Sequence, residues 1–230
     1  MPRSASVACI ARLVVAVAAA AAGCGGKVVR LGCPHAQVKA NEVLWIGDSW
    51  MLVPASSAPM RVQDLARAAG AIGASDDYTI GAAAATTMPT IAGQYDTEEA
   101  GATKVKALIE DGGTWETINA MMNGTTVASA ASGAASAFSQ HLAKVVSDGT
   151  VEHVIYFLPP ELSTIPGVVE LRPLVKQACA QSTVPCHFLD LEPIWSGHPE
   201  YSVGFLPSDA GATVLANAIW AVMQQNCVAQ

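Results

Sequence analysis

Charged residues are scarce in this sequence. Asp, Glu, Lys and Arg make up 13% of its 230 residues, about half the usual share. The acidic residues outnumber the basic ones by 19 to 12, which gives a formal net charge of −7. A nucleic-acid binder needs a basic face that releases counterions, so the charge excludes that class. No block of like charges is present, and a chain that is 51% hydrophobic is too apolar for intrinsic disorder.

The sequence also lacks, near its beginning, an apolar run that could cross a bilayer. Residues 13–22 are ten uncharged Leu, Val and Ala residues, whereas a membrane span takes about 20. Arg3 and Arg12 precede the core of this run, and the small residues Ala21, Ala22 and Gly23 follow it. This order is typical of a secretory signal peptide, so we predict one over residues 1–23 and an exported protein.

Cys24 stands directly after this segment and leaves two alternatives open. The segment resembles a bacterial lipobox, in which the cysteine is lipidated and becomes the new N-terminus. It departs from that pattern at Ala21, where such boxes prefer leucine. The protein is therefore expected either in the bacterial cell envelope, touching the membrane only through a lipid anchor on Cys24, or secreted after ordinary cleavage. Residues 24–40 are predicted to be a tether and 41–230 a single domain.

Metal and nucleotide motifs are absent as well. No Cys-x-x-Cys occurs, which argues against a zinc site, and no Walker-type phosphate loop occurs, which argues against a nucleotide-binding module. We expect no cofactor. The cysteines of an exported chain favour disulfides, and we predict the pairs Cys179–Cys186, across a short turn, and Cys33–Cys227, near the two ends of the domain.

Short apolar runs and helical patterns alternate along the domain. Strands are predicted at 42–46, 78–80, 115–122, 151–158 and 184–191. Helices are predicted at 61–71, 98–109, 134–146, 168–180 and 208–225, with Ser208 as the N-cap of the last. Five alternations indicate an α/β fold with a five-stranded parallel sheet covered by helices on both faces.

Ligands of such folds bind beyond the carboxyl ends of the strands, and a serine lies at the end of the first. Gly47-Asp48-Ser49 follows the strand 42–46 directly. A serine on a tight turn between a buried strand and a helix is where a nucleophile can be displayed. The other interpretation is a turn that only caps the helix, and the local sequence does not separate the two.

Four segments resemble blocks of the SGNH/GDSL hydrolases, in the order in which that family has them. The segment 45–49, Trp-Ile-Gly-Asp-Ser, is similar to the first block, and 78–84 falls where the second lies. Asn-Ala-Met-Met-Asn-Gly at 119–124 falls at the third block, a Gly-x-Asn-Asp pattern, and 203–211 falls at the Asp-x-x-His block. The resemblance implies a three-layer flavodoxin-like fold and an esterase, lipase or carbohydrate deacetylase activity.

The resemblance also implies roles for individual residues. Ser49 takes the place of the nucleophile, and Asp48 that of the residue that shapes the serine turn. Asn123 takes the place of the side-chain oxyanion donor, although its neighbours are not the glycine and aspartate of the family. Ala84 stands near the oxyanion glycine and offers a backbone N–H, but its Cβ restricts the backbone.

The last block departs from the family pattern at both catalytic positions. Val203 stands where the triad acid belongs, and Leu206 stands where the general base belongs. Neither side chain can move a proton, and a serine hydroxyl needs a base within hydrogen-bond reach. His198, in the loop before this block, is the only candidate for a substitute base there, although a solvated loop histidine is the simpler interpretation. The other histidines are expected in the tether (His35), on a helix surface (His141) and in or beside strands (His153, His187).

The sequence therefore predicts the fold more strongly than the reaction. One expectation is an exported ester hydrolase of this type, acting on acyl or acetyl esters, possibly linked to a glycan, with weak or lost activity. The alternative is a non-catalytic lipoprotein that binds a small-molecule or glycan ligand in the same cleft. The family pattern favours the first, and the pair Val203 and Leu206 favours the second.

Overall fold

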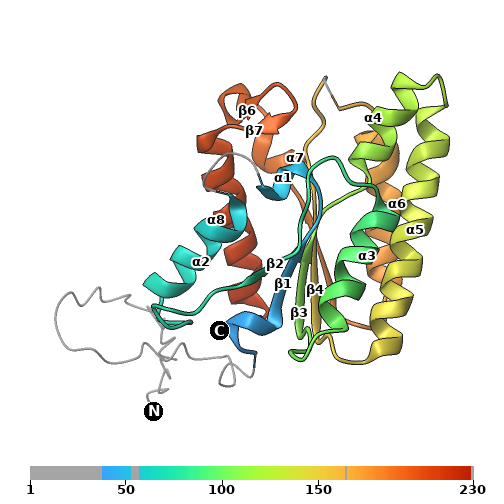
Figure 1. Ribbon diagram of the computed structural model, residues 1–230. Coiled ribbons are helices and arrows are strands. Elements are labelled where there is room, and N and C mark those ends of the chain that lie inside the picture. Colours follow the sequence, from blue (N-terminus) through green and yellow to red (C-terminus); the bar gives the residue numbers. More distant parts are fainter. Residues whose placement is uncertain (1–37, 53–56, 164, 229–230) are drawn as a thin grey trace, which may run out of the picture.

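Five parallel strands form the central sheet of the domain, in the order β2-β1-β3-β4-β5 (Figure 1). The computed structural model describes residues 38–52, 57–163 and 165–228. The strands are β1 (Val43–Ile46), β2 (Thr79–Ile80), β3 (Ala107–Glu110), β4 (His153–Leu158) and β5 (Cys186–Asp190). This is the strand order of flavodoxin-like folds, so the predicted fold class is confirmed.

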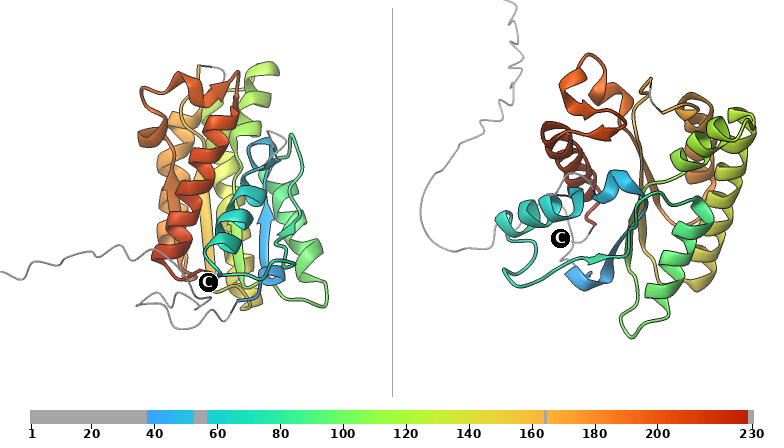
Figure 2. Two further views of the ribbon diagram at one scale, coloured as in Figure 1. Left: turned by 90° about the vertical axis from the view of Figure 1, so that its left-hand side faces the viewer. Right: turned by 45° about the horizontal axis from the view of Figure 1, so that its top comes forward.

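Helices cover both faces of this sheet and give three layers (Figures 1 and 2). One layer holds α2 (Ala58–Ala68) and α8 (Asp209–Gln225), which pack against each other. The other layer holds α3 (Met88–Glu99), α4 (Thr114–Met122), α5 (Val127–Asp148) and α6 (Val168–Gln181). The shorter helical elements are η1 (Ala40–Glu42), α1 (Ser49–Leu52), α7 (Glu192–Trp195) and η2 (Pro199–Tyr201).

The core lies on both faces of the central strands. Every residue of β1 and β3 is buried, as are all residues of β4 after His153. Strands that are covered on both faces are mostly apolar rather than alternating, which is why β1 and β4 stand out in the sequence as short continuous apolar runs. In register, Ile46 of β1 lies beside Glu110 of β3, so both strands end at the same edge of the sheet.

The prediction of the third strand was wrong. Residues 115–122 form the helix α4, and β3 begins within the last three residues of the predicted helix 98–109. Trp115, Ile118 and Met122 recur at intervals of three and four residues, which is a helical period. The short run 107–110 becomes a strand because it is buried between β1 and β4, a tertiary effect that outweighs helix propensity.

A two-stranded antiparallel hairpin lies between α7 and α8. It consists of β6 (Ser202–Val203) and β7 (Leu206–Pro207), and β7 packs against α1. The predicted cap of the last helix is present, because the Ser208 side chain accepts a hydrogen bond from Gly211 N–H. The hairpin therefore packs between α1, which begins at Ser49, and α8.

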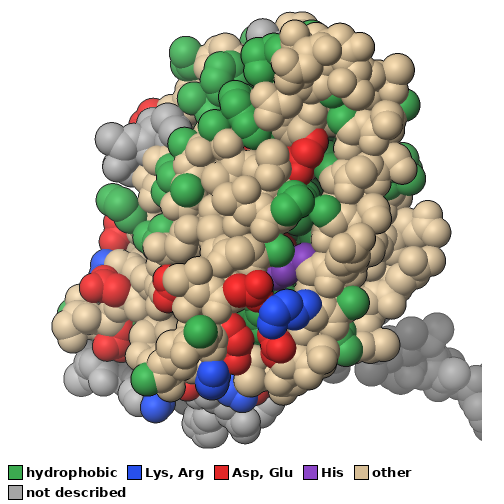
Figure 3. Space-filling view, turned by 45° about the vertical axis from the view of Figure 1, so that its right-hand side comes forward, with side chains coloured by type: hydrophobic (Ala, Val, Ile, Leu, Met, Phe, Trp, Pro, Cys, Tyr) green, Lys and Arg blue, Asp and Glu red, His purple; other side chains and the backbone are tan. Residues whose placement is uncertain are grey.

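The surface over α3 to α5 has an uneven distribution of charge (Figure 3). Charged side chains gather toward the amino ends of the strands. Among the ion pairs of these helices, Lys144 of α5 pairs with Asp96 of α3 and with Asp148 of α5. The carboxyl end shows mainly uncharged and hydrophobic side chains in this view. Within the described part of the chain, no helix has both the length and the apolar character that a membrane span requires.

One of the two predicted disulfides joins two described residues, and the structure confirms it. Cys179, near the end of α6, is bonded to Cys186, the first residue of β5, with the two Cα atoms 5.2 Å apart. The other predicted pair includes Cys33, which lies outside the described residues, as does the candidate lipidation site Cys24. The bond confirmed here is compatible with an oxidising compartment.

Removal of this disulfide is expected to destabilise the domain moderately. The bond closes a short loop, with a sequence separation of 7, and the chain-entropy estimate gives about 2.5 kcal/mol for a loop of this size. Urea denaturation of the Cys179→Ala/Cys186→Ala variant, compared with the oxidised wild type, measures the loss. An unchanged denaturation midpoint would contradict the expectation.

Candidate active site

The serine turn joins β1 to α1 at the carboxyl edge of the sheet. Gly47 has φ +145°, and a Cβ built on it would lie 1.7 Å from Asp111 Oδ1. Only glycine fits a backbone of this conformation this close to another residue. Gly47 N–H donates to Gln94 Oε1 at 2.9 Å, which ties the turn to α3 and sets the direction in which Ser49 begins α1.

Asp48 holds this turn from inside the protein. Its side chain is buried, and its carboxylate accepts hydrogen bonds from Trp50 N–H and from the Thr114 hydroxyl, each at 3.0 Å. The bond to Trp50 closes the first turn of α1, and the bond to Thr114 joins α1 to α4. Asp48 therefore links the backbone around Ser49 to α4 from a buried position.

Ser49 Oγ accepts a hydrogen bond from Ala85 N–H at 3.2 Å. Ala85 has φ +56°, a left-handed conformation that residues with a Cβ seldom adopt. Its loop is tied to the serine turn, because Ala83 N–H and the Thr86 hydroxyl both donate to Gly47 O, at 3.1 Å each. The N–H beside Ser49 thus belongs to Ala85, one residue after Ala84, to which the sequence had assigned the oxyanion role.

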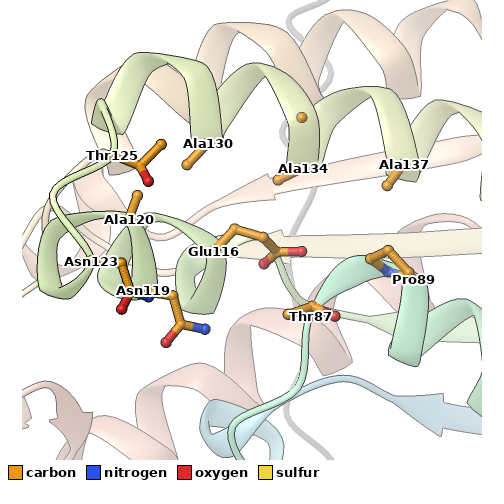
Figure 4. A pocket seen from close by; sticks show the side chains of 11 residues that line it. Thr87, Pro89, Glu116, Asn119, Ala120, Asn123, Thr125, Ala130, Ala134 and Ala137 are labelled. Carbon is orange, nitrogen blue, oxygen red and sulfur yellow. The ribbon is translucent and has the colours of Figure 1, made fainter.

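Asn123 is not among the described residues that form a hydrogen bond with Ser49. It is the C-cap residue of α4 and lines a cavity of about 430 Å³ between α4 and α5. Figure 4 shows it beside Asn119, with Glu116 further along the same helix and Thr87 opposite. Ser49 is not among the residues that line this cavity. Among the described residues no hydrogen bond joins Asn123 to Ser49, so an oxyanion role for Asn123 stays a prediction.

The misplaced third strand explains where Asn123 lies. The carboxyl end of β3 is followed by Asp111-Gly112-Gly113, and the sequence had assigned this segment to the end of a helix. Asp111, which sequence reasoning missed, therefore occupies the position beside the serine turn. Its Oδ1 accepts Asp48 N–H at 2.9 Å. Burial and the nearby charge of Asp48 raise the pKa of Asp111 well above its usual range.

The β6–β7 hairpin packs against α1, the helix that begins at Ser49. Trp50 Nε1 donates to Phe205 O at 2.9 Å, and the Trp50 and Trp195 rings lie 5.8 Å apart. Val203 is 71% exposed and Leu206 is partly buried. The two positions that the resemblance assigns to the acid and the base thus lie on a hairpin that packs against α1, but their side chains cannot exchange protons.

The His198 side chain contacts Glu200 and Tyr201. Its Nδ1 lies 2.9 Å from Glu200 Oε1, and its ring stacks on Tyr201 with the ring centroids 4.5 Å apart. It lines a second cavity, of about 470 Å³, together with Trp195 and Gly204. Ser49 is not part of that lining, and the described residues show no hydrogen bond between Ser49 and His198. A role for His198 as substitute base stays a prediction.

The remaining described histidines have partners within the fold. His141 was expected on a helix surface but is buried, with Nε2 3.1 Å from Glu110 Oε2. This side of α5 packs against α3, where the His141 ring lies 5.3 Å from the Tyr95 ring, and it reaches Glu110 of β3. His153 Nδ1 and His187 Nε2 lie 3.2 Å apart, at neighbouring positions of β4 and β5. Within the described residues, no group of three or more His, Cys, Asp or Glu side chains could hold a metal ion.

Comparisons with known proteins find the same architecture in esterases. No family model matches the chain, and no curated protein matches it. The crystal structure of an alpha/beta hydrolase enzyme from the metagenome of Lake Arreo, Spain, is 14% identical with a TM-score of 0.63, and the match covers 85% of this chain and 99% of that chain.

Two acetylxylan esterases match over a similar extent. The enzyme from Geobacillus stearothermophilus is 15% identical with a TM-score of 0.59, over 80% of this chain and 94% of its own. A second acetyl xylan esterase is 12% identical with a TM-score of 0.63, over 78% and 98%. At these identities the likeness shows a shared fold, and that fold agrees with the one implied by the resemblance of the serine motif to SGNH/GDSL hydrolases.

Proposed function

We propose that this chain is an exported SGNH/GDSL-type ester hydrolase whose hydrolytic activity is weak or lost. The observation that carries the proposal is the environment of Ser49 Oγ, which is bonded to Ala85 N–H. No imidazole or carboxylate of the described residues forms a hydrogen bond with it. A serine hydroxyl without such a partner is a poor nucleophile at neutral pH.

The groups that remain can bind an ester better than they can cleave it. Backbone N–H groups beside the serine, such as that of Ala85, can stabilise an oxyanion without a base. In serine proteases that lack triad residues, such donors and substrate binding retain roughly 10³–10⁴-fold acceleration over the reaction in water. The substrate class that fits this proposal is an acyl or acetyl ester, possibly on a glycan.

The second candidate function is ligand binding without catalysis. Val203 and Leu206 favour it. Apolar side chains at both proton-transfer positions cannot support ester cleavage, but they leave the cleft available to a ligand. Cavities of about 430 and 470 Å³ open beside α4 and beside α7, and both volumes lie within the range that holds small-molecule ligands. The ligand would be a small molecule or a glycan ester.

Export and anchoring belong to the same proposal. The segment 1–23 supports a signal peptide, and Cys24 supports a lipid anchor joined to the domain by residues 24–40. The Cys179–Cys186 bond supports an oxidising compartment. One acyl chain binds a membrane only weakly, so stable anchoring through Cys24 requires more than one chain.

Wild-type protein is expected to hydrolyse 4-nitrophenyl acetate slowly or not at all. Ser49→Ala should then lower the rate less than about tenfold, because the triad that makes a serine indispensable is incomplete. Initial rates of the wild type, Ser49→Ala and the surface control Ser132→Ala test this. Efficient turnover that only Ser49→Ala abolishes would contradict the proposal and direct attention to His198, whose replacement by Ala would then have to silence the enzyme equally.

A further inference from the structure

Two carboxyl groups lie buried together beneath the serine turn. Asp48 is 3% exposed and Asp111 is 0% exposed. Asp48 N–H donates to Asp111 Oδ1 at 2.9 Å, and a Cβ on Gly47 would overlap Asp111 Oδ1. Asp111 is therefore in direct contact with the backbone of two successive residues that precede Ser49.

No cation balances this pair in the described part of the chain. The other titratable groups on the elements around Asp111 are Glu110 on β3, Glu116 on α4, Tyr156 on β4, His141 on α5 and Tyr95 on α3. His141 is the group among them that can become cationic, and it lies against Glu110. Two adjacent carboxyls without a cation in a buried site do not both ionise.

The hydrogen bonds decide which of the two keeps the proton. Asp48 accepts a donor on each oxygen, Trp50 N–H on Oδ1 and the Thr114 hydroxyl on Oδ2. An oxygen pair that accepts two such bonds is stabilised as the carboxylate. Asp111 accepts one N–H on Oδ1, while its Oδ2 is buried without a hydrogen-bond partner among the described residues. A proton on Oδ2 would turn this orphaned oxygen into a donor, and Asp48 is the side chain that interacts with the Asp111 carboxyl.

We propose that Asp111 is a positioning residue that supports the Ser49 turn as a neutral carboxylic acid. The neutral carboxyl accepts Asp48 N–H with one oxygen and donates toward the Asp48 carboxylate with the other. Loss of the proton places two negative charges in one buried site and pushes the turn away from β3. The effect of Asp111 on ester chemistry rests on the proposed function, whereas its protonation and its support of the turn do not.

The pH dependence of stability follows from the direction of the shift. Burial and the charge of Asp48 raise the pKa of Asp111 in the folded protein, whereas an unfolded Asp titrates at about 3.9. Unfolding above that pH therefore releases a proton. The contribution of Asp111 is fully present below about pH 3.9 and is lost as the pH rises through the folded pKa.

Carbon NMR of wild-type protein with labelled Asp carboxyls tests the proposal directly. We expect the Asp111 Cγ signal to remain that of a neutral acid at a pH well above about 3.9, where an unfolded Asp titrates. We also expect the amide signals of Asp48 and Trp50 to shift together with Asp111 when it ionises. An Asp111 signal that titrates in the usual range of Asp, or a proton found on Asp48 instead, would overturn the proposal.

Two variants separate positioning from packing. Asp111→Asn keeps an acceptor for Asp48 N–H and replaces the acid O–H by an amide N–H, so it should retain the wild-type amide signals of the turn. It should also remove the fall in denaturation midpoint that we expect of the wild type as the pH rises above about 3.9 toward the raised pKa of Asp111. Asp111→Ala should lose the wild-type amide signals of the turn at every pH. The exposed control Asp64→Asn should keep the wild-type dependence of the denaturation midpoint on pH. An Asp111→Asn protein as damaged as Asp111→Ala would contradict the proposal.

Hydrolysis rates add a functional measurement. In any form of the protein that cleaves 4-nitrophenyl acetate, Asp111→Asn should extend activity to a more alkaline pH than its parent shows. A wild type that cleaves this ester efficiently would contradict the proposed function, while the NMR titration and the denaturation profiles would still decide the role of Asp111.

Discussion

The double variant Val203→Asp/Leu206→His is expected to hydrolyse 4-nitrophenyl acetate about 10³-fold or more faster than the wild type. Removal of triad members from serine hydrolases lowers the rate by comparable factors. The hairpin that carries both positions is already in place, because β7 packs against α1 and Trp50 Nε1 donates to Phe205 O. Ser208 caps the helix that follows it.

The environment of both positions accepts the new side chains. Val203 is 71% exposed, so an aspartate there is not forced out of water, and Leu206 is only partly buried. The expected base would act on Ser49 Oγ, which now has Ala85 N–H as its partner. The rate increase in the double variant should far exceed the sum of the increases in the two single variants. An acid without a base, or a base without an orienting acid, leaves the catalytic triad incomplete.

The gain must depend on Ser49 to support this interpretation. Values of kcat/KM are compared for the wild type, the two single variants, the double variant and the double variant that also carries Ser49→Ala. The last should return to the wild-type rate. A double variant that folds but stays as slow as the wild type would show that the hairpin does not hold these positions within reach of the serine.

Gly47→Ala is expected to lower the free energy of unfolding by more than about 3 kcal/mol, because backbone strain and a severe overlap act at the same residue. The added Cβ would lie 1.7 Å from Asp111 Oδ1, and the backbone has φ +145°. Asp111 is wholly buried and cannot turn away into solvent. Urea denaturation followed by circular dichroism measures the loss.

Gly149→Ala is the matched control for this prediction. Gly149 also has a positive φ, +69°, but a Cβ on it would meet nothing within 4 Å. Its replacement should therefore cost only the backbone strain of a left-handed residue, roughly 1–2 kcal/mol. Equal losses in the two variants would show that the contact between Gly47 and Asp111 is not tight.

The serine site illustrates where sequence reasoning succeeds and where it stops. Gly47-Asp48-Ser49 could be placed at the end of a buried strand because its neighbours form an apolar run that a glycine ends. The glycine is needed for the turn, and the structure shows the same order. Asp111 could not be found in this way. It looks like a surface Asp-Gly turn in sequence, and its burial depends on residues 63 positions away.

Sequence patterns misassigned the segment that runs from β3 into α4. Strand β3 has four residues, too few to show a period, so the helical propensity of its neighbours outweighed it in the prediction. That error moved the expected third block to Asn123, which the structure places at the end of α4. His141 was misjudged for a similar reason, since only the packing of α5 against the sheet shows which side of that helix is buried.

The sequence by itself determined the alternating α/β fold, the serine turn, the Cys179–Cys186 bond and the apolar identity of residues 203 and 206. All of these depend on local composition or on residues close in the chain, where steric preference and hydrophobic period act directly. Only the tertiary structure decided that Ala85 N–H meets Ser49, that Asp111 lies under the turn and that Asn123 lies beside a different cavity. These are contacts between distant segments, and the burial of strands in the sheet, rather than any local pattern, brings them together.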